Sequence, residues 1–516
     1  MDQSLFERAT GALGPNVFAR LETTRLMRSF RPAPHFRFDG GHKGIVTDGF
    51  GGTSEAYSLG VNSPKDQDVW AHQAGVNALA VERFDGRMLI SGGTDATIKL
   101  WDLEQCGNPH AKHTYKPAAT IPRVESTTKG HKFGITHLSF FPTDPGAFLS
   151  SSYDQTLKIW DTTEGAQLSG SWDLGSKLYT HAVSPIAHHL LVACGSAHPA
   201  VRLVDLRTNA ATQTLAPPRP MGNTGGAVLA LAWSPRHEHI LASGTLDGAV
   251  RIWDIRRSSP LLALLDQEDN IGISALRSGA TTTTTTGVST SITSRSNNPL
   301  AHGTRLTAKA HAGPVNGLAW TDDGAYLVSA GHDRRIRVWD AATGANTLVS
   351  FGPSIRNGQL SNVPLFTTPT GLLSPKKDLL FWPNETEILV MELHEGTIVT
   401  RLRPPGASSA LAGVRNASRP GERSVRNRIT GLVWRGAGAH GGTGSSGIVS
   451  GGANAAGGAV FSGRMDGQIH AWMPYCLGDK DDEVVVSDQE LHLQNRKRKA
   501  LDDAYNSLMG NTITWT

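Results

Sequence analysis

A single spacing recurs along this chain: a serine, an aspartate four residues later and a tryptophan six residues after that. It occurs as Ser91/Asp95/Trp101, Ser150/Asp154/Trp160, Ser243/Asp247/Trp253, Ser329/Asp333/Trp339 and Ser462/Asp466/Trp472. In four of these five copies a second aspartate directly follows the tryptophan. A spacing repeated this regularly indicates copies of one small structural unit and argues against a set of unrelated domains.

A second marker lies upstream of the serine in four of the copies. It is a six-residue apolar segment, and it begins at Val76, Ile135, Val228 and Val315. Each segment begins 14 or 15 residues before the serine of its own copy. Short apolar segments bounded by turn residues are typical of buried strands.

Weaker copies fill the remaining intervals of the chain. One of them places His198 in the aspartate position and Val204 in the tryptophan position, and another covers roughly residues 369–393. The last copy begins at Ile429 and is interrupted by a glycine-, alanine- and serine-rich insertion of about residues 436–457. The total is seven units.

Each unit holds three or four short strands over about 40–50 residues, the period of a propeller blade with a Trp-Asp signature. One such sheet cannot bury both of its faces, whereas sheets stacked in a ring bury them against one another and leave only short edges exposed. The sequence therefore predicts an all-β, seven-bladed WD-repeat β-propeller over residues 31–478.

The repeated polar residues are predicted to form a scaffold. His72, His131 and His311 lie 18 or 19 residues before the serines of their copies. A histidine, the serine hydroxyl, the aspartate and the indole N–H can form one buried chain of hydrogen bonds in each blade. A Ser/His/Asp set that recurs around a ring is structural, so we expect no nucleophilic triad.

Residues 1–30 stand outside the repeats and are predicted to be helical in two pieces, separated at Gly14 and Pro15. Val17 and Leu21 share one face of the second piece because they are four residues apart. Two interpretations are open: the helices rest on their own propeller, or they dock another protein. The glycine-rich stretch from Phe36 to about Trp70 is expected to supply the strand that closes the ring.

Two further segments interrupt or follow the ring. A polar stretch of about residues 267–305, with threonine at every position from 281 to 286, is predicted to be disordered, as is the 436–457 insertion. The charged tail, residues 479–516, contains Arg496, Lys497, Arg498 and Lys499. This run is interpreted as a nuclear-import signal or as an ordinary charged tail.

Composition limits the classes of partner. A net charge of +4 over 516 residues gives no concentrated basic field, so direct nucleic-acid binding is not expected. An arginine-rich segment, residues 414–428, is either a solvated linker or a contact for an acidic partner. Three scattered cysteines form neither a disulfide framework nor a zinc pattern, which favours a reducing compartment. We expect no metal, no cofactor and no membrane span.

Several segments resemble one family closely. They are GVNALAVERFDGRMLISGGTDATIKLWDLE, SSYDQTLKIWDT, LAWSPRHEHILASGTLDGAVRIWDIRR, and VNGLAWTDDGAYLVSAGHDRRIRVWD with the following GANTLVSFG. With the N-terminal FERATGAL segment they resemble the Cockayne syndrome group A WD-repeat proteins. These are substrate receptors of cullin-RING ubiquitin ligases in transcription-coupled nucleotide excision repair. The insertions, the threonine run and the basic tail depart from that family.

The resemblance implies a non-catalytic receptor in the nucleus that binds a damaged-DNA-binding-protein-type adaptor of a cullin-4-class ligase. Its targets would be a repair ATPase and stalled RNA polymerase II. The resemblance assigns the N-terminal helices to the adaptor, and we expect their anchors to be Phe6, Leu13, Val17 and Leu21. A chain lacking residues 1–30 is expected to stay folded and to lose the adaptor.

The same resemblance gives a role to the stretch Trp253-Asp254-Ile255-Arg256, because receptors of this type end a blade's third strand with Trp-Asp-x-Arg. A partial version contains Asp205 and Arg207. An arginine just beyond a strand end can present its planar fork to a partner. Alternatively, Arg256 only pairs with Asp254 or with a neighbouring blade and positions the loop.

Two rival functions remain at this stage. One is a chromatin or RNA-processing scaffold that binds peptides without a ligase. The other is an enzyme with its site in the central channel, which requires a cluster of catalytic residues. His188 and His189 form the only adjacent histidine pair, and no third ligand accompanies them at metal spacing.

Overall fold

The computed structural model describes residues 3–41, 69–106, 112–123, 130–162, 165–186, 189–208, 210–216, 226–269, 308–369, 371–374, 376–404, 427–436 and 458–474. The chain divides into two compact units, Met1–Pro474 and Tyr475–Thr516. The second unit lies outside the described residues, and with it the basic run at 496–499. The threonine run and nearly all of both predicted insertions lie outside them too.

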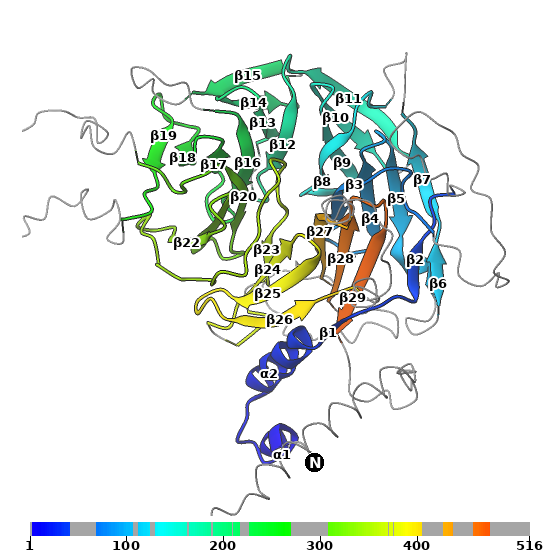
Figure 1. Cartoon of the computed structure of the whole chain (residues 1–516), viewed down its shortest axis with the longest axis vertical. Helices are drawn as coiled ribbons and strands as arrows, with labels where there is room; N and C mark the ends of the chain where they lie inside the picture. The colour runs from blue at the N-terminus through cyan, green and yellow to red at the C-terminus, as the bar shows by residue number, and fades with distance from the viewer. Residues whose placement is uncertain are drawn as a thin grey trace, which may run out of the picture. The chain divides into compact units, whose positions relative to one another are not determined.

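The first unit is a ring of seven antiparallel sheets (Figure 1). Blade 1 contains β3 (Val76–Val81), β4 (Met88–Gly93), β5 (Ile98–Asp102) and β7 (Pro117–Ile121), with a 3-10 turn at Leu103–Gln105. Blade 2 contains β8 (Ile135–Phe141), β9 (Asp144–Ser152), β10 (Thr156–Asp161) and β11 (Gln167–Asp173). Blade 3 contains β12 (Leu178–Val183), β13 (Leu191–Ser196), β14 (Val201–Asp205) and β15 (Ala210–Leu215).

The remaining four blades follow the same order. Blade 4 contains β16 (Val228–Trp233), β17 (Ile240–Thr245), β18 (Val250–Asp254) and β19 (Leu261–Leu264). Blade 5 contains β20 (Val315–Trp320), β21 (Tyr326–Gly331) and β22 (Ile336–Asp340). Blade 6 contains β23 (Phe366–Thr367), β24 (Leu379–Asn384), β25 (Glu387–Glu392) and β26 (Ile398–Leu402). Blade 7 contains β27 (Ile429–Arg435), β28 (Ala459–Arg464), β29 (Ile469–Pro474) and, from the other end of the chain, β1 (Phe30–Pro32). The predicted fold class, a seven-bladed all-β propeller, is confirmed.

The core consists of seven apolar clusters, one at each junction between neighbouring blades. Each cluster contains one side chain from the tryptophan position of a third strand: Trp101, Trp160, Val204, Trp253, Trp339, Met391 and Trp472. The two weak repeats thus keep the position and replace the indole with a smaller apolar group. This packing explains why the tryptophan recurs at a fixed spacing: it fills the gap to the preceding blade.

The ring closes through the N-terminal strand. β1 pairs antiparallel with β29, in the register Phe30 with Pro474 and Pro32 with Trp472. The prediction that Phe36–Trp70 supplies this strand was wrong, since the closing strand ends four residues earlier. β2 (Phe36–Phe38) instead pairs parallel with β6 (His113–Tyr115) beside blade 1. Residues 42–68 lie outside the described part of the chain.

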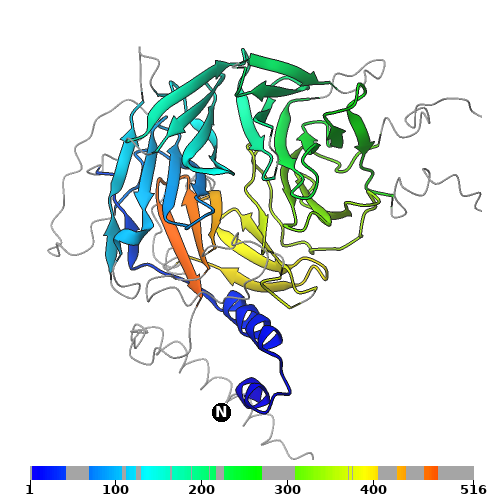
Figure 2. The same cartoon turned by 180° about the vertical axis from the view of Figure 1, so that it is seen from behind.

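Two helices precede β1, as the sequence predicted: α1 (Gln3–Ala9) and α2 (Pro15–Arg28). Pro15 begins α2, where a missing N–H costs no hydrogen bond. Figures 1 and 2 both show α2 beside β26 and β29, at the border of blades 6 and 7.

The loops of the ring define two faces. The side of the ring that carries the loops from first to second strands and from third to fourth strands is called the lower face. The upper face carries the turns between second and third strands and the links that lead into each first strand. Successive antiparallel strands end on opposite sides of a sheet, so these two sets of loops cannot mix.

Candidate functional site

The serine of each strong repeat is the junction of a buried hydrogen-bond chain. In blade 2 the Ser150 hydroxyl accepts from Trp160 Nε1 at 2.8 Å and lies 2.6 Å from His131 Nε2. His131 Nδ1 lies 2.9 Å from an Asp154 carboxylate oxygen. The Ser150 and His131 side chains have almost no exposed surface. This chain of hydrogen bonds therefore links the core of the blade to the turn on the upper face. Its serine and histidine are too deeply buried to contact a substrate.

The other blades repeat or shorten this chain. In blade 5, His311 bridges Ser329 and Asp333 at 2.8 and 2.9 Å, and Trp339 donates to Ser329. In blade 1, His72 bonds Ser91 and Thr97 at 2.8 Å each, Asp95 accepts from Thr97, and Trp101 donates to Ser91. In the described parts of blades 4 and 7 the serine bonds only the indole, Trp253 to Ser243 at 2.7 Å and Trp472 to Ser462 at 3.0 Å.

The aspartate also closes the turn in which it stands. The carboxylates of Asp95, Asp154, Asp247, Asp333 and Asp466 each accept the backbone N–H two residues later. The intervening residue has a positive φ in every case, for example 71° at Gln155 and 87° at Gly248. In blade 3, His198 replaces the carboxylate and accepts from the Ala200 N–H through Nδ1 at 3.1 Å.

Burial governs the ionisation of these groups. It lowers the pKa of His72, His131 and His311 below 6.5, although the adjacent aspartates favour the charged form. Burial alone would raise the pKa of Asp95, but the hydrogen bond and charge from His72 lower it to about 2. Neutral imidazoles locked between a serine and a carboxylate are scaffold parts, not acid–base catalysts.

The Trp-Asp-x-Arg stretch separates into a buried and an exposed part. Trp253, which the resemblance includes in the adaptor-binding stretch, is 1% exposed and packs in the core between blades 3 and 4, so its side chain is not accessible to a partner in this structure. Asp254 accepts from Arg256 Nε and Nη2, each at 3.2 Å. The Arg256 side chain is 63% exposed. Its pKa is raised by the Asp254 carboxylate, so a charged fork is held at the lower face.

The partial copy in blade 3 stands at the equivalent place. The Asp205 carboxylate accepts the Arg207 backbone N–H at 2.9 Å, and Arg207 is exposed. In blade 1 the position of Asp254 is taken by Asp102, which pairs with Arg87 at 2.8 Å. The predicted pair of arginines after third strands thus lies on neighbouring blades 3 and 4, on one face.

Helix α2 is anchored to that same face at its C-terminal end. Arg28 pairs with Glu392, which ends the third strand of blade 6 as Asp254 ends that of blade 4. The Thr24 hydroxyl accepts the Ser374 N–H at 3.3 Å, from the loop between β23 and β24. Met27 and Phe30 are buried in the cluster between blades 6 and 7.

Three of the four predicted anchors in the helical segment are exposed. Of the four predicted anchors, Phe6, Val17 and Leu21 are 60%, 50% and 40% exposed, and Leu13 is half-buried. The interpretation of helices resting along their own propeller therefore holds only for the last two turns of α2. Sequence reasoning missed two exposed apolar residues of the lower face, Phe84 and Ile186. Both lie in loops between first and second strands, where no spacing signals them.

Similarity to known proteins shows the family of the chain. The family described as "WD domain, G-beta repeat" matches residues 66–102, 123–161, 217–254 and 304–340. The WD repeat-containing protein ATCSA-1 of Arabidopsis thaliana is 31% identical over 331 residues, which are 57% of this chain and 72% of that protein. The chain belongs to the WD-repeat family. The four matched stretches are blades 1, 2, 4 and 5 of this WD-repeat protein, and the structure supplies the other three.

Two further relatives of this WD-repeat protein carry different names. Radiation-sensitive protein 28 of Saccharomyces cerevisiae is 29% identical over 42% of the chain and 39% of its own length. The ribosome biogenesis protein ytm1 of Aspergillus niger is 27% identical over 52% of the chain and 53% of its own length. The chain spans about half or less of these two relatives.

Within the described part of the chain, the residues considered for catalysis are not gathered into a site. Among the described residues no three His, Cys, Asp or Glu side chains are placed to hold a metal ion. His189 Nε2 bonds the Glu238 carbonyl at 2.9 Å, whereas His188 lies outside the described residues. In the same described part of the WD-repeat protein, no helix has the length and hydropathy needed to cross a membrane.

Proposed function

We propose that this WD-repeat protein is the non-catalytic substrate receptor of a cullin-4-class ubiquitin ligase and acts in the nucleus in transcription-coupled repair. The lower face would hold a damaged-DNA-binding-protein-type adaptor. A repair ATPase and stalled RNA polymerase II would be the targets presented to the ligase. Such a receptor accelerates ubiquitin transfer by raising the effective concentration of target lysines.

One observation carries the proposal: the two features that the resemblance assigns to an adaptor occupy the same face. Arg256 and Arg207 present charged forks there, and α2 is fastened there through Arg28 and Glu392. The exposed Phe6, Val17 and Leu21 supply apolar area on the helices that extend from blades 6 and 7. Exposed apolar anchors and charged groups are both typical of a protein-binding surface.

The name of the plant relative supports the same assignment, since ATCSA-1 is the relative with 72% of its length covered. The resemblance of the quoted repeat segments to Cockayne syndrome group A proteins points in the same direction. The yeast relative is named for radiation sensitivity, which agrees with a role in repair.

The test is an affinity purification of the intact protein from its own cells, with Arg256→Ala and Arg257→Ala beside it. Both arginines are exposed, but only Arg256 is held by the Asp254 carboxylate. We expect adaptor and cullin with the intact chain and with Arg257→Ala, and at least a ten-fold loss with Arg256→Ala. No ligase subunit with the intact chain would refute the receptor role, and equal recovery with all three proteins would exclude Arg256 from the adaptor contact.

A second function, an RNA-processing or chromatin scaffold that works without a ligase, is favoured by the ribosome biogenesis relatives. Ytm1 of Aspergillus niger and the WDR12 homologue of Chlamydomonas reinhardtii, 29% identical over 39% of the chain, both carry that name. The same purification separates the two functions. Recovery of pre-ribosomal proteins in place of a cullin, unchanged by Arg256→Ala, supports the scaffold.

A further inference from the structure

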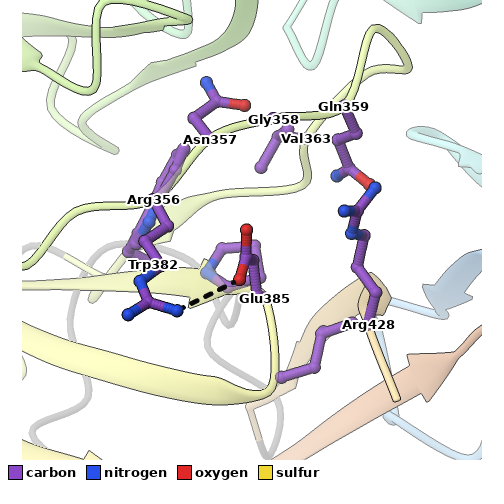
Figure 3. Close-up of a pocket in the computed structure, with 10 residues that line it drawn as sticks. Arg356, Asn357, Gly358, Gln359, Val363, Trp382, Glu385 and Arg428 are labelled. Atoms are coloured by element: carbon purple, nitrogen blue, oxygen red, sulfur yellow. Dashed lines mark hydrogen bonds and ion pairs between the residues drawn. The ribbon is translucent and has the colours of Figure 1, made fainter. Parts of the chain in front are cut away.

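A pocket opens on the upper face where blade 6 meets blade 7, on the side of the ring opposite Arg256. The volume of about 220 Å³ counts all non-atom space in this hollow, open solvent included. Three segments line it: 356–363, which leads into blade 6; the β24–β25 turn with Glu385; and the start of β27 with Arg428. Figure 3 shows Arg356 and Glu385 on one side of the pocket and Arg428 rising from the other side toward Gln359.

The segment that forms one wall is fixed in place. The buried Asn357 and Asn316 side chains exchange two amide hydrogen bonds, at 2.7 and 2.9 Å. Asn316 and His332 both bond the Gln359 carbonyl at 2.6 Å. Asn384 accepts the Arg356 N–H at 2.6 Å. The wall is therefore preorganised by blades 5 and 6 before any ligand arrives, which is what a specific site requires.

The donors that face this pocket are incompletely used. Among the described residues, the buried Arg428 Nε and Trp382 Nε1 atoms have no hydrogen-bond partner. Arg356, 69% exposed at its side chain, reaches only Glu385, at the long distance of 3.5 Å. Buried polar atoms are nearly always paired in folded proteins, so unpaired donors lining a pocket point to an acceptor that arrives from outside.

The charges that line the pocket favour a carboxylate over a phosphate as the acceptor. Two arginines and one glutamate leave one unit of positive charge in the pocket. A carboxylate brings one negative charge, whereas a phosphate brings between one and a half and two and would lie beside Glu385. Arginine forks also match the planar, two-oxygen shape of a carboxylate. Leu360, next to the lining residues, is 55% exposed and offers apolar contact to a longer ligand.

We propose that this pocket binds an aspartate or glutamate side chain of a partner protein's extended segment, with Arg428 and Arg356 on the carboxylate. The inference rests on the proposed function in one respect: if the lower face binds the adaptor, the upper face is the one that binds the target. Binding in the pocket can nevertheless be measured without any ligase subunit.

The test uses fluorescence polarisation with four pools of labelled heptapeptides that are randomised except at the central residue. That residue is Glu, Gln, Asp or phosphoserine. We expect the Glu or Asp pool to bind the intact protein about 10-fold or more tightly than the Gln pool, because a charge-assisted hydrogen bond is gained. Arg428→Gln should remove this preference. Glu385→Gln, which takes away the competing carboxylate, should strengthen binding of the acidic pools.

The matched control is Arg335→Gln, which removes one charge from an exposed turn of the same face in blade 5. An equal loss with Arg335→Gln would show unspecific attraction and overturn the site. Tightest binding of the phosphoserine pool, or no preference among pools, would overturn the carboxylate assignment. Adaptor recovery with Arg428→Gln is expected to be unchanged, so failure here and failure of the receptor role are distinguishable. Thermal unfolding confirms that each variant is folded.

Discussion

At the scale of single residues, we expect substitution of the repeated serine to destabilise the blades that carry it. Ser150 has two buried partners, Trp160 and His131, whereas Ser243 has only Trp253 among the described residues. Ser150→Ala leaves two buried groups unpaired, so we expect a loss of about 2–3 kcal/mol in the free energy of unfolding. Ser243→Ala should lose about 1 kcal/mol. Urea denaturation measures both, and equal losses would contradict the role of the histidine.

A buried histidine makes the stability depend on pH. His181 is 1% exposed, and its Nε2 and Nδ1 lie 2.8 and 3.0 Å from the hydroxyls of Ser139 and Ser151. Burial, and then the neighbouring His137, lower its pKa well below 6.5. The folded state keeps the ring neutral, while the unfolded chain takes up a proton as the pH falls through about 6.5. Stability is therefore complete above that pH and falls below it.

At pH 5.5 the expected loss from this one residue is about 1 kcal/mol relative to pH 7.5. His181→Gln removes the titration and keeps an amide near the two serines. Urea unfolding at both pH values should show a pH dependence smaller by that amount in the variant. An unchanged difference would mean that His181 has the same pKa in the folded and the unfolded protein.

At the scale of elements, α2 is held by its C-terminal turns and leaves its first turns exposed. If the adaptor uses the exposed face, the double variant Val17→Asp, Leu21→Asp should lower adaptor recovery at least ten-fold. Its thermal midpoint should not change, because both side chains are more than a third exposed. Asn16→Asp places one charge on the same helix as a control and should bind normally. Normal binding by the double variant would exclude α2 from the interface.

The elements also show which features a sequence can predict. The spacing of tryptophan, serine and aspartate predicted the blades because these residues make the same contacts in the five blades that carry them. Val204 was placed in the tryptophan position on spacing alone. The closing strand Phe30–Pro32 was missed because three residues are too few for a periodic pattern. The pocket on the upper face was missed because Arg356, Glu385 and Arg428 come from three loops that only the closed ring brings together.

At the scale of the whole molecule, one short strand joins the two ends of the ring and follows directly after the helices that we propose bind the adaptor. α2 ends at Arg28 and β1 begins at Phe30, so the proposed docking and the ring closure use adjoining residues. Met27 and Phe30 are both buried, at 4% exposure each. The expectation that residues 1–30 can be removed without harm to the fold must therefore be revised. A deletion that tests docking alone has to end before Met27.

Two truncations separate the functions. A chain that starts at Met27 keeps the ring closed and should unfold at the midpoint of the intact protein while losing the adaptor. A chain that starts at residue 34 loses Met27, Phe30 and the pairing of β1 with β29. It should lose at least about 3 kcal/mol from the buried aromatic ring alone, and the open edge of β29 should promote aggregation. Thermal unfolding and size-exclusion chromatography measure both effects. Equal stability of the two truncated chains would mean that blade 7 closes the ring without β1.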